Sequence, residues 1–339
     1  MPVTTIQWEK DHIKLVDQTR LPQKFVHVRC KTVSSLFRAI RRLSVRGAPA
    51  LGAAGGLGVL LAAHQYKGNS PKALIKKLTQ TADYLATSRP TAVNLFYALN
   101  NMKRVAETNQ NKSIKEIRTA IEREAFRIVE EDRQLCRAIG RAGSQLIKNG
   151  MNVLTICNTG ALATVDYGTA LGVLFRAKAE KKKFHVYACE TRPLLQGARL
   201  NTWELLREGI KTTLICDSMA AFLMKDGRID IVLTGADRIA ANGDAANKIG
   251  TYSLAVLAKY HKVPFYIVAP STTVDLSIRS GKQIPIEERK KEEVTHFRGV
   301  QSSPKDVHVY NPAFDVTPHQ LITGIVTERG IHKKPFNFT

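Results

Sequence analysis

The sequence predicts an α/β protein in two parts, a mainly helical N-terminal domain with a small β-sheet and a C-terminal domain built on a doubly wound parallel sheet. Residues 1–144 open with short alternating apolar runs and continue with apolar residues at helical spacing. Residues 145–339 instead alternate short β-branched runs with helical segments, the pattern of parallel strands covered on both faces. A chain of 339 residues with 44% hydrophobic content is long enough to bury both cores.

The N-terminal elements follow from two periods in the sequence. Alternation of apolar and polar residues predicts strands at 5–8, 13–16 and 25–28. Apolar residues that recur on one helical face predict helices at 32–42, 71–88 and 113–149. The third helix is heavily charged on its outer side, so we expect it to lie at the surface.

The C-terminal domain is expected to contain six strands, each a short apolar run bounded by turn residues, at 153–157, 185–189, 212–216, 229–234, 265–269 and 307–310. A helix is expected to open at Asn158 and end near Leu174. A second helix is expected to grow out of the glycine-punctuated segment 235–250.

The formal net charge of +22 comes from 51 Lys and Arg against 29 Asp and Glu. These cations are dispersed and lack the aromatic interleaving of a single-strand binding face, so the sequence favours a solvated basic surface over nucleic-acid binding. The same charge would steer an anionic substrate, such as a phosphate, toward the protein.

Several functional classes are disfavoured by what the sequence lacks. No apolar run approaches the ~18 residues that span a bilayer, and the first residues do not follow the secretory pattern, so we expect a cytoplasmic protein without a membrane partner. The five cysteines are widely spaced and no histidine pairs at metal-ligand spacing, which predicts reduced thiols and no metal. With neither a Walker loop nor a Gly-x-Gly-x-x-Gly turn after a strand, no nucleotide cofactor is expected.

Two predicted strands end in turns that carry a reactive side chain. One strand runs into Cys157, and another runs through Gly235 into Asp237. Because ligands of open α/β sheets bind at the carboxyl ends of the strands, we expect these two residues to share one site. The alternatives are a buried structural cysteine and an aspartate that caps a helix. The geometry favours an enzyme.

Three further segments could bind an anionic substrate. Arg46, Gly47 and Ala48 precede a Gly/Ala-rich helix, where backbone amides, the helix dipole and a guanidinium would hold phosphate, although close helix packing explains the glycines equally well. Gln196 lies in a polar loop after the second strand, where an internal Glu-Arg salt bridge is the alternative. Asn247 and Lys248 are expected near a helix start and could hold an anion together.

Eight segments, in order and spread over nearly the whole chain, carry a more specific signal. They are Val45-Arg-Gly-Ala-Pro-Ala50, Ser88-Arg-Pro-Thr-Ala-Val-Asn-Leu95, Cys157-Asn-Thr-Gly-Ala-Leu-Ala-Thr164, Glu190-Thr-Arg-Pro-Leu-Leu-Gln-Gly197, Gly235-Ala-Asp-Arg-Ile-Ala-Ala-Asn-Gly-Asp244, Asn247-Lys-Ile-Gly250, Ile286-Glu-Glu-Arg289 and Asn311-Pro-Ala-Phe-Asp-Val-Thr-Pro318. Together these segments resemble the methylthioribose-1-phosphate isomerase family of methionine salvage.

This resemblance implies a Rossmann-like C-terminal domain in a cofactor-free, usually dimeric isomerase. It implies conversion of 5-methylthioribose 1-phosphate to 5-methylthioribulose 1-phosphate, with Asp237 as the proton donor and Cys157 supporting the transition state. It further implies that the sugar phosphate is bound by Arg46, Gly47, Ala48, Arg89, Gln196, Asn247 and Lys248.

Two alternatives share the expected fold. A ribose-1,5-bisphosphate isomerase would need additional cations for a second phosphate in place of an apolar pocket. A non-catalytic regulatory subunit of the translation-initiation exchange factor would bind proteins, and it would have no reason to keep Cys157 and Asp237 together in polar surroundings. The sequence leaves open whether hydrogen moves as a proton or a hydride, and whether other deoxypentose 1-phosphates are accepted.

Overall fold

The computed structural model describes residues 2–90, 92–297 and 299–338 of the chain. It divides into two compact units, one formed by Met1–Arg137 with Thr159–Gly172, the other by Ala138–Asn158 with Val173–Thr339. The first unit therefore includes a segment from the middle of the chain. The domain boundary between residues 144 and 145 does not take account of that segment and remains a prediction.

The first unit begins with a three-stranded antiparallel sheet in the order β1-β2-β3. Its strands are β1 (Ile6–Glu9), β2 (His12–Val16) and β3 (His27–Cys30). The first two lie within a residue of their predicted positions, whereas β3 begins two residues later than expected. Ile13 and Leu15 of β2 alternate with half-buried polar residues and are fully buried, as expected for a sheet with one face on a core, and the adjacent Val16 is buried as well.

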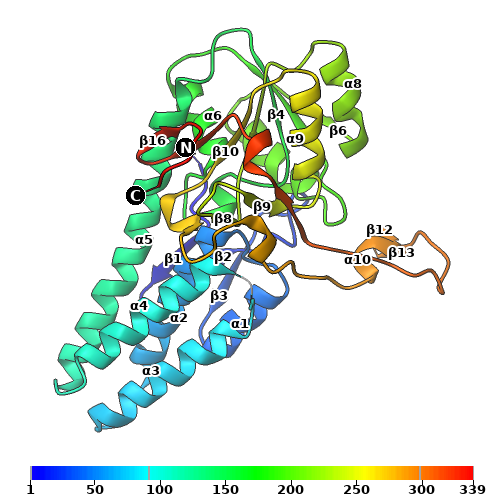
Figure 1. The fold of residues 1–339 in the computed structure, drawn as a ribbon. Coiled ribbons are helices and arrows are strands. Elements are labelled where there is room, and N and C mark those ends of the chain that lie inside the picture. The colour runs from blue at the N-terminus through cyan, green and yellow to red at the C-terminus, as the bar shows by residue number, and fades with distance from the viewer. Residues whose placement is uncertain (1, 91, 298, 339) are drawn as a thin grey trace. The chain divides into compact units, whose positions relative to one another are not determined.

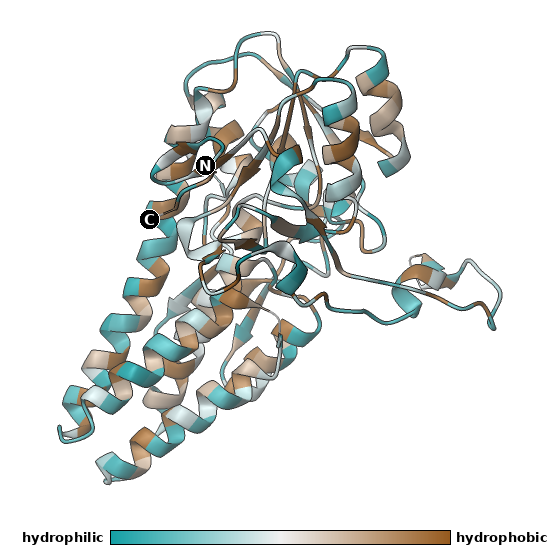
Figure 2. Ribbon diagram, in the orientation of Figure 1, coloured by the Kyte–Doolittle hydropathy of each residue, from teal (hydrophilic) through white to brown (hydrophobic). Residues whose placement is uncertain are grey.

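Five helices follow the sheet: α1 (Val33–Arg41), α2 (Ala48–Gln65), α3 (Pro71–Ala86), α4 (Val93–Thr108) and α5 (Ile114–Ser144). Local signals fix where they begin. Thr32 forms a capping box with Ser35 before α1, and the Ser70 hydroxyl caps α3 directly before its first residue, Pro71. In Figure 2, α5 alternates between hydrophilic and hydrophobic colours along its length, as a helix with one exposed face should.

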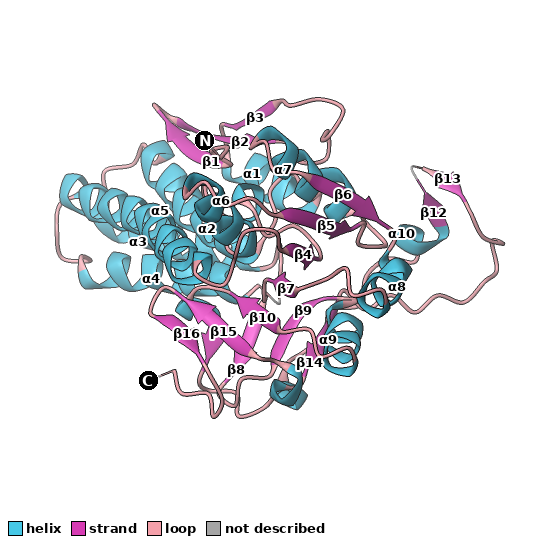
Figure 3. Ribbon diagram, turned by 90° about the horizontal axis from the view of Figure 1, so that it is seen from above, coloured by secondary structure: helices cyan, strands magenta, loops and turns pink. Residues whose placement is uncertain are grey.

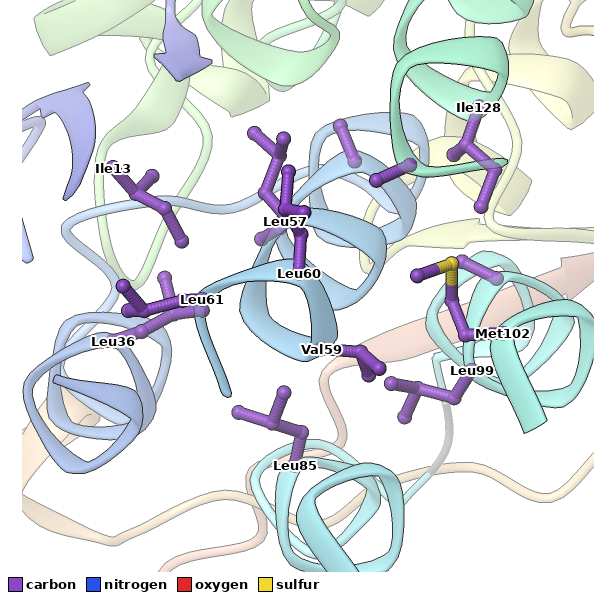
Figure 4. Packing of buried hydrophobic residues seen from close by; sticks show 14 of the residues in the cluster. Ile13, Leu36, Leu57, Val59, Leu60, Leu61, Leu85, Leu99, Met102 and Ile128 are labelled. Carbon is purple, nitrogen blue, oxygen red and sulfur yellow. The ribbon is translucent and has the colours of Figure 1, made fainter. Parts of the chain in front are cut away.

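Helix α2 is the centre of the first unit, because it is apolar all round and buried from Ala48 to Ala63 apart from Pro49. Figure 4 shows its leucines, Leu57, Leu60 and Leu61, surrounded by side chains of the neighbouring elements. These neighbours include Leu36 of α1, Leu85 of α3, Met102 of α4 and Ile128 of α5. The Gly/Ala-rich sequence of α2 lets these helices approach closely.

The second unit is built on a seven-stranded sheet in the order β16-β15-β10-β7-β4-β5-β6 (Figure 3). Its strands are β4 (Asn152–Thr155), β5 (His185–Cys189), β6 (Thr212–Ile215), β7 (Ile231–Thr234), β10 (Phe265–Val268), β15 (Gly324–Thr327) and β16 (Gly330–His332). All neighbours are parallel except β15 and β16. The chain builds outward from β4 in one direction, then returns to β7 and builds in the other, which confirms the doubly wound sheet.

Helices connect the parallel strands on both faces of this sheet. They are α6 (Ala170–Ala179), α7 (Thr202–Arg207), α8 (Ala220–Lys225) and α9 (Thr251–Tyr260). In Figure 3, α6 and α7 lie on one side of the strands, and α8 and α9 lie on the other. The central strands are coloured hydrophobic in Figure 2, and every residue of β7 is buried, as covering from both sides requires.

Smaller elements complete the two units. A four-stranded sheet contains β11 (Val274–Asp275), β8 (Arg238–Ala240), β9 (Ala245–Lys248) and β14 (Phe314–Thr317), and a short hairpin contains β12 (His296–Phe297) and β13 (Val300–Gln301) after α10 (Glu292–Thr295). One-turn segments lie at η1 (Ala161–Ala163), η2 (Gly197–Asn201), η3 (Asp217–Met219), η4 (Ser271–Thr273), η5 (Gly281–Gln283) and η6 (His319–Leu321).

The strand predicted at 307–310 is wrong, because these residues form no strand. Val307 is 42% exposed and Tyr310 is 80% exposed, so the run buries too little apolar surface to join a sheet. The last parallel strand of the main sheet is β15 instead, about fifteen residues further along the chain.

Candidate active site

The two predicted catalytic residues lie at the same edge of the seven-stranded sheet. Cys157 follows the last residue of β4 by two positions, and Asp237 follows that of β7 by three. These strands are parallel neighbours, with Leu154 opposite Val232. They are also the two strands between which the direction of winding reverses, the place where open α/β sheets bind ligands. The pairing inferred from the sequence is thus consistent with the topology.

Cys157 has an unusual backbone conformation. Its φ is +64°, in the left-handed region that costs a residue with a side chain on the order of 1–3 kcal/mol. The residue is 5% exposed, and its backbone N–H donates to the Thr191 hydroxyl at 2.8 Å. Such strain persists only where the surroundings hold it, and it is concentrated at functional sites.

The segment after Cys157 is not the predicted helix. Asn158 is buried and donates from Nδ2 to Glu204 Oε1 at 2.7 Å, and the single turn η1 follows. Helix α6 begins only at Ala170, so no long helix opens at Asn158. The sequence misled because the apolar residues of this loop, which include Leu162 and Val165, are buried without forming a helix.

Within the first unit, the segment 159–172 is anchored by side chains. Asp132 of α5 accepts the Val165 N–H at 2.7 Å, and complete burial raises the pKa of its carboxyl to about 7. Gln18 donates to the Leu162 carbonyl at 2.7 Å, and Thr5 donates to the Ala161 carbonyl at the same distance. The chain beyond Cys157 and Asn158 is therefore firmly held.

Asp237 is half-buried and begins a β-hairpin. Its N–H donates to the Ala246 carbonyl at 2.9 Å, continuing the ladder in which Arg238 pairs with Ala246 across β8 and β9. The alternative that Asp237 caps a helix is wrong, since strands and not a helix follow it. Its carboxyl group belongs to a turn fixed by backbone hydrogen bonds.

Asn247 and Lys248 lie in strand β9, so their predicted place near a helix start is wrong in detail, although α9 begins three residues later. Asn247 is 4% exposed and donates from Nδ2 to the hydroxyls of Thr234 and Thr251, at 2.8 and 2.9 Å. Since Thr234 ends β7, Asn247 is tied to the same strand end that leads to Asp237. The Lys248 ammonium donates to the Ala313 carbonyl at 2.8 Å.

Gln196 is a buried polar residue with an unused acceptor. It is 5% exposed, and its Oε1 has no hydrogen-bond partner among the residues that the structure describes. Leaving a buried amide oxygen unpaired is costly, which marks it as a group ready to accept a ligand's hydroxyl. The nearby Arg192 guanidinium donates to the carbonyls of Pro193 and Val294, a different arrangement from the internal salt bridge considered above.

The start of α2 carries the predicted phosphate-binding residues of the first unit. Gly47 has a φ of +93°, and a Cβ there would lie 2.3 Å from the Ala163 carbonyl oxygen, so both conformation and space require glycine. Arg46 precedes it and Ala48 is the first helical residue. Close packing therefore does explain Gly47, and it leaves phosphate binding open. Arg89 is half-buried in the loop between α3 and α4, in which Thr91 lies outside the described residues.

The pKa values of the other four cysteine thiols are raised, which favours the protonated form. Burial raises the pKa values of Cys30, Cys136 and Cys189, and the negative charge of Glu190 raises that of Cys216. Within the described part of the chain, no three His, Cys, Asp or Glu side chains are grouped as metal ligands. No helix described is both long and apolar enough to cross a membrane.

Sequence reasoning missed the residues that hold this site. Thr191 supports Cys157, Asp217 supports Thr191, and Thr234 supports Asn247. Each lies at or just after the end of a strand, so a rule that inspects every strand end for hydroxyls and carboxylates would have selected them. Their partners belong to other strands, and the periodicity of apolar residues along the sequence does not show which strands are neighbours.

The chain is similar to known proteins along almost its whole length. Residues 44–334 match the model of the initiation factor 2 subunit family. A methylthioribose-1-phosphate isomerase of Geotalea uraniireducens is 51% identical over 98% of this chain and 96% of its own, and methylthioribose-1-phosphate isomerase 1 of Pseudothermotoga lettingae is 52% identical over 98% and 95%.

The similar solved structures carry two kinds of name. That of 5-methylthioribose 1-phosphate isomerase from Pyrococcus horikoshii is 44% identical, with a TM-score of 0.92 over 99% of this chain and 94% of the other. That of a protein from A. fulgidus named translation initiation factor eIF-2B, subunit delta, is 46% identical, with a TM-score of 0.88 over 98% and 96%.

Proposed function

This chain belongs to the initiation factor 2 subunit family and, within it, to the methylthioribose-1-phosphate isomerases, and on that premise we propose how its carboxyl-edge residues carry out the isomerisation of 5-methylthioribose 1-phosphate to 5-methylthioribulose 1-phosphate. In this proposal Asp237 is the proton donor and Cys157 supports the transition state. The observation that carries it is the position of both residues beyond neighbouring parallel strands, at the reversal of winding.

The substrate's chemistry explains the need for an acid. Phosphate on the C1 oxygen prevents the ring from opening simply to a free aldehyde, so the bond between C1 and the ring oxygen must break with the phosphate in place. Asp237 gives its proton to the ring oxygen as that bond breaks, and the alkoxide never forms.

The hydrogen on C2 must then move to C1. In one route it leaves as a proton to Cys157, which returns it to C1 through an enediol, and in the other it moves directly as a hydride while Cys157 stabilises the charge. Both routes leave a carbonyl at C2 and a CH₂ group at C1. The C2 hydroxyl proton is released as the carbonyl forms and replaces the one that Asp237 gave to the ring oxygen, so atoms and electrons balance. Deuterium appearing at C1 when the reaction runs in D₂O identifies the proton route.

Binding is assigned to groups at both ends of the substrate. Arg46, the amides of Gly47 and Ala48, and Arg89 are proposed to hold phosphate, since guanidinium forks and free helix N–H groups suit phosphate oxygens. Gln196 is proposed to accept a sugar hydroxyl at its unpaired Oε1.

Asn247 and Lys248 are proposed to hold the sugar phosphate beside Asp237, which their place on β9 supports. We further propose that the protein acts in the cytoplasm as a homodimer. Sedimentation velocity at micromolar concentration tests the homodimer, and a single species of 37.6 kDa, the mass of one chain, would contradict it.

The test is conversion of methylthioribose 1-phosphate followed by proton NMR. Cys157→Ser and Asp237→Asn should each lose at least about 100-fold in kcat, the usual contribution of positioned acid-base groups. Matched controls are Cys189→Ser, a buried cysteine of β5, and Asp226→Asn, a surface carboxylate after α8. Both should stay within about twofold of the native chain, and circular dichroism confirms that all four variants fold.

One observation favours a second function, the translation-factor name of the 46% identical A. fulgidus protein. A folded native chain that converts neither methylthioribose 1-phosphate nor ribose 1,5-bisphosphate would move the assignment to a protein-binding role. Turnover of the bisphosphate alone would reassign the substrate and keep the catalytic residues.

A further inference from the structure

We propose that Thr191 and Asp217 are positioning residues that hold Cys157 in the backbone conformation its role in catalysis requires. The inference deepens the proposed function and rests on it. Neither residue contacts substrate in this proposal, and both act through Cys157. The evidence is a chain of hydrogen bonds that joins the carboxyl ends of three neighbouring strands, β4, β5 and β6.

The first link joins β4 to β5. The backbone N–H of Cys157 donates to Thr191 Oγ1 at 2.8 Å, and the same hydroxyl donates its own proton to the Cys189 carbonyl at 3.1 Å. The hydroxyl therefore acts as acceptor and donor at once, and its orientation is fixed. Valine, which has the same shape, can do neither.

The second link joins β5 to β6. One carboxylate, that of Asp217, accepts two successive backbone N–H groups, from Thr191 at 2.8 Å and from Arg192 at 2.7 Å. Asp217 begins η3 just after β6. Charge-assisted bonds of this length are strong, and a carboxylate that receives two neighbouring amides fixes the direction of the chain between them.

Both linked residues are held in left-handed backbone conformations. Thr191 has a φ of +67° and Cys157 a φ of +64°. For a β-branched residue this is a clear outlier, and it needs an external restraint. Asp217 supplies the restraint for Thr191, and Thr191 supplies it for Cys157. No bond of this kind is needed to complete the parallel ladders, whose last pairs are Thr155 with Ala188 and Cys189 with Ile215.

The left-handed turn sets where the Cys157 side chain is aimed. In a continuing strand, successive side chains alternate between the two faces of the sheet, both of which are covered by helices here. A left-handed residue just past the strand breaks this alternation, so its side chain takes a direction that a continuing strand would not give it. We call the hydrogen bonds from Asp217 to Thr191 and from Thr191 to Cys157 the relay. If the relay is removed, we expect the fold to persist and the Cys157 thiol to leave the position that catalysis requires.

The experiment compares Thr191→Val, Thr191→Ser and Asp217→Asn with the native chain. Thr191→Val should lower kcat at least about 30-fold, and Asp217→Asn should lower it about 10-fold. In both variants KM should stay within about twofold of the native value. Thr191→Ser keeps the hydroxyl and should recover kcat to within about threefold. The control is Thr327→Val, because Thr327 is also buried and its hydroxyl also accepts a backbone N–H, but at β15, three strands from β4.

Hydrogen exchange at the Cys157 amide provides a readout that does not depend on turnover. Thr191→Val removes the acceptor of that N–H, so exchange should accelerate at least about tenfold, and it should remain native-like in Thr191→Ser and Thr327→Val. Faster exchange with kcat within twofold of native would overturn the proposal, since the bond would then serve the fold alone. If the native chain has no turnover, the proposed function fails separately, and hydrogen exchange alone then tests the relay. Unchanged exchange at the Cys157 amide in Thr191→Val overturns the relay, and accelerated exchange supports it.

Discussion

The two strand ends that form the candidate site are held in different ways. The turn at Cys157, after β4, is held by side chains. The Thr191 hydroxyl accepts the Cys157 N–H, and the Asp217 carboxylate accepts the Thr191 N–H. The turn at Asp237, after β7, is held by main-chain pairing, because Asp237 donates to Ala246 at the start of the β8-β9 ladder. One end is strained and the other continues into regular structure.

This difference predicts how each end responds to mutation. A turn held by two side chains loses its restraint when one of them is replaced. A turn held by a ladder keeps its backbone when a single side chain changes, so substitutions there act on the groups that the ladder carries. We therefore expect single changes near Cys157 to disturb the backbone of the turn, and with it stability or the chemical step. Single changes near Asp237 should leave the backbone in place and alter binding or local stability.

The largest expected effect is that of Gly197→Ala, on the Cys157 side. A Cβ at Gly197 would lie 1.7 Å from the Cys189 carbonyl oxygen and 2.8 Å from Thr191 Oγ1, so the backbone that supports Thr191 must move. We expect a loss of about 4 kcal/mol or more in the free energy of unfolding, measured by urea denaturation.

The matched control for this change is Gly227→Ala. Gly227 has a φ of +67° but open space around the added Cβ, so its replacement should cost only about 1 kcal/mol of backbone strain. Equal losses in the two variants would mean that the contact with Cys189 relaxes freely, and the rigid turn described here would not exist.

The sequence predicted the parts of this comparison that depend on local pattern. The predicted run 153–157 covers all of β4 except its first residue and ends at Cys157, and the run 229–234 contains β7 and ends three residues before Asp237. Strand-helix alternation was sufficient to place both at one edge, because parallel strands all end on the same side. The roles of Cys157 and Asp237 themselves remain predictions.

What could not be predicted depends on contacts between distant segments. The loop after Cys157 has a helix-like pattern, yet its apolar residues are buried by tertiary packing, with Val165 held by Asp132 from α5. The segment that carries Asn247 looked helical, but β14 pairs with it from nearly seventy residues away and makes it a strand. Local propensity loses to such pairing whenever the partner is remote in sequence.

The next effect in size concerns Asp315 of β14, which lies opposite Asn247 on the Asp237 side. Its carboxylate accepts the Gly250 and Tyr252 N–H groups at 2.7 and 3.0 Å, yet burial raises its pKa to about 6. The folded chain therefore binds this proton more tightly than the unfolded chain does. The resulting stabilisation is complete below pH ~4 and is lost as the pH rises through about 6.

Asp315→Asn removes this titration while keeping a similar shape. Between pH 4.5 and 7, the native chain should lose about 2 kcal/mol of unfolding free energy relative to the variant, less than the full pKa difference implies because the group is partly exposed. Urea denaturation of both chains at several pH values measures the difference. Parallel stability curves would show that Asp315 ionises in the folded chain as it does in water.

The smallest expected effect comes from Thr234→Val, which repeats at the Asp237 end the replacement proposed for Thr191. Thr234 ends β7 and accepts one of the two hydrogen bonds from Asn247 Nδ2, so valine leaves a buried amide hydrogen unpaired at a cost of about 1–2 kcal/mol. The β8-β9 ladder still fixes Asp237, so kcat should stay within about twofold, while KM should rise about fivefold because Asn247 is less well oriented for substrate.

Thr234→Ser restores the acceptor and should return KM to the native value. A fall in kcat as large as that expected for Thr191→Val would show that the strand ends depend on their threonines alike, and that main-chain pairing does not protect Asp237.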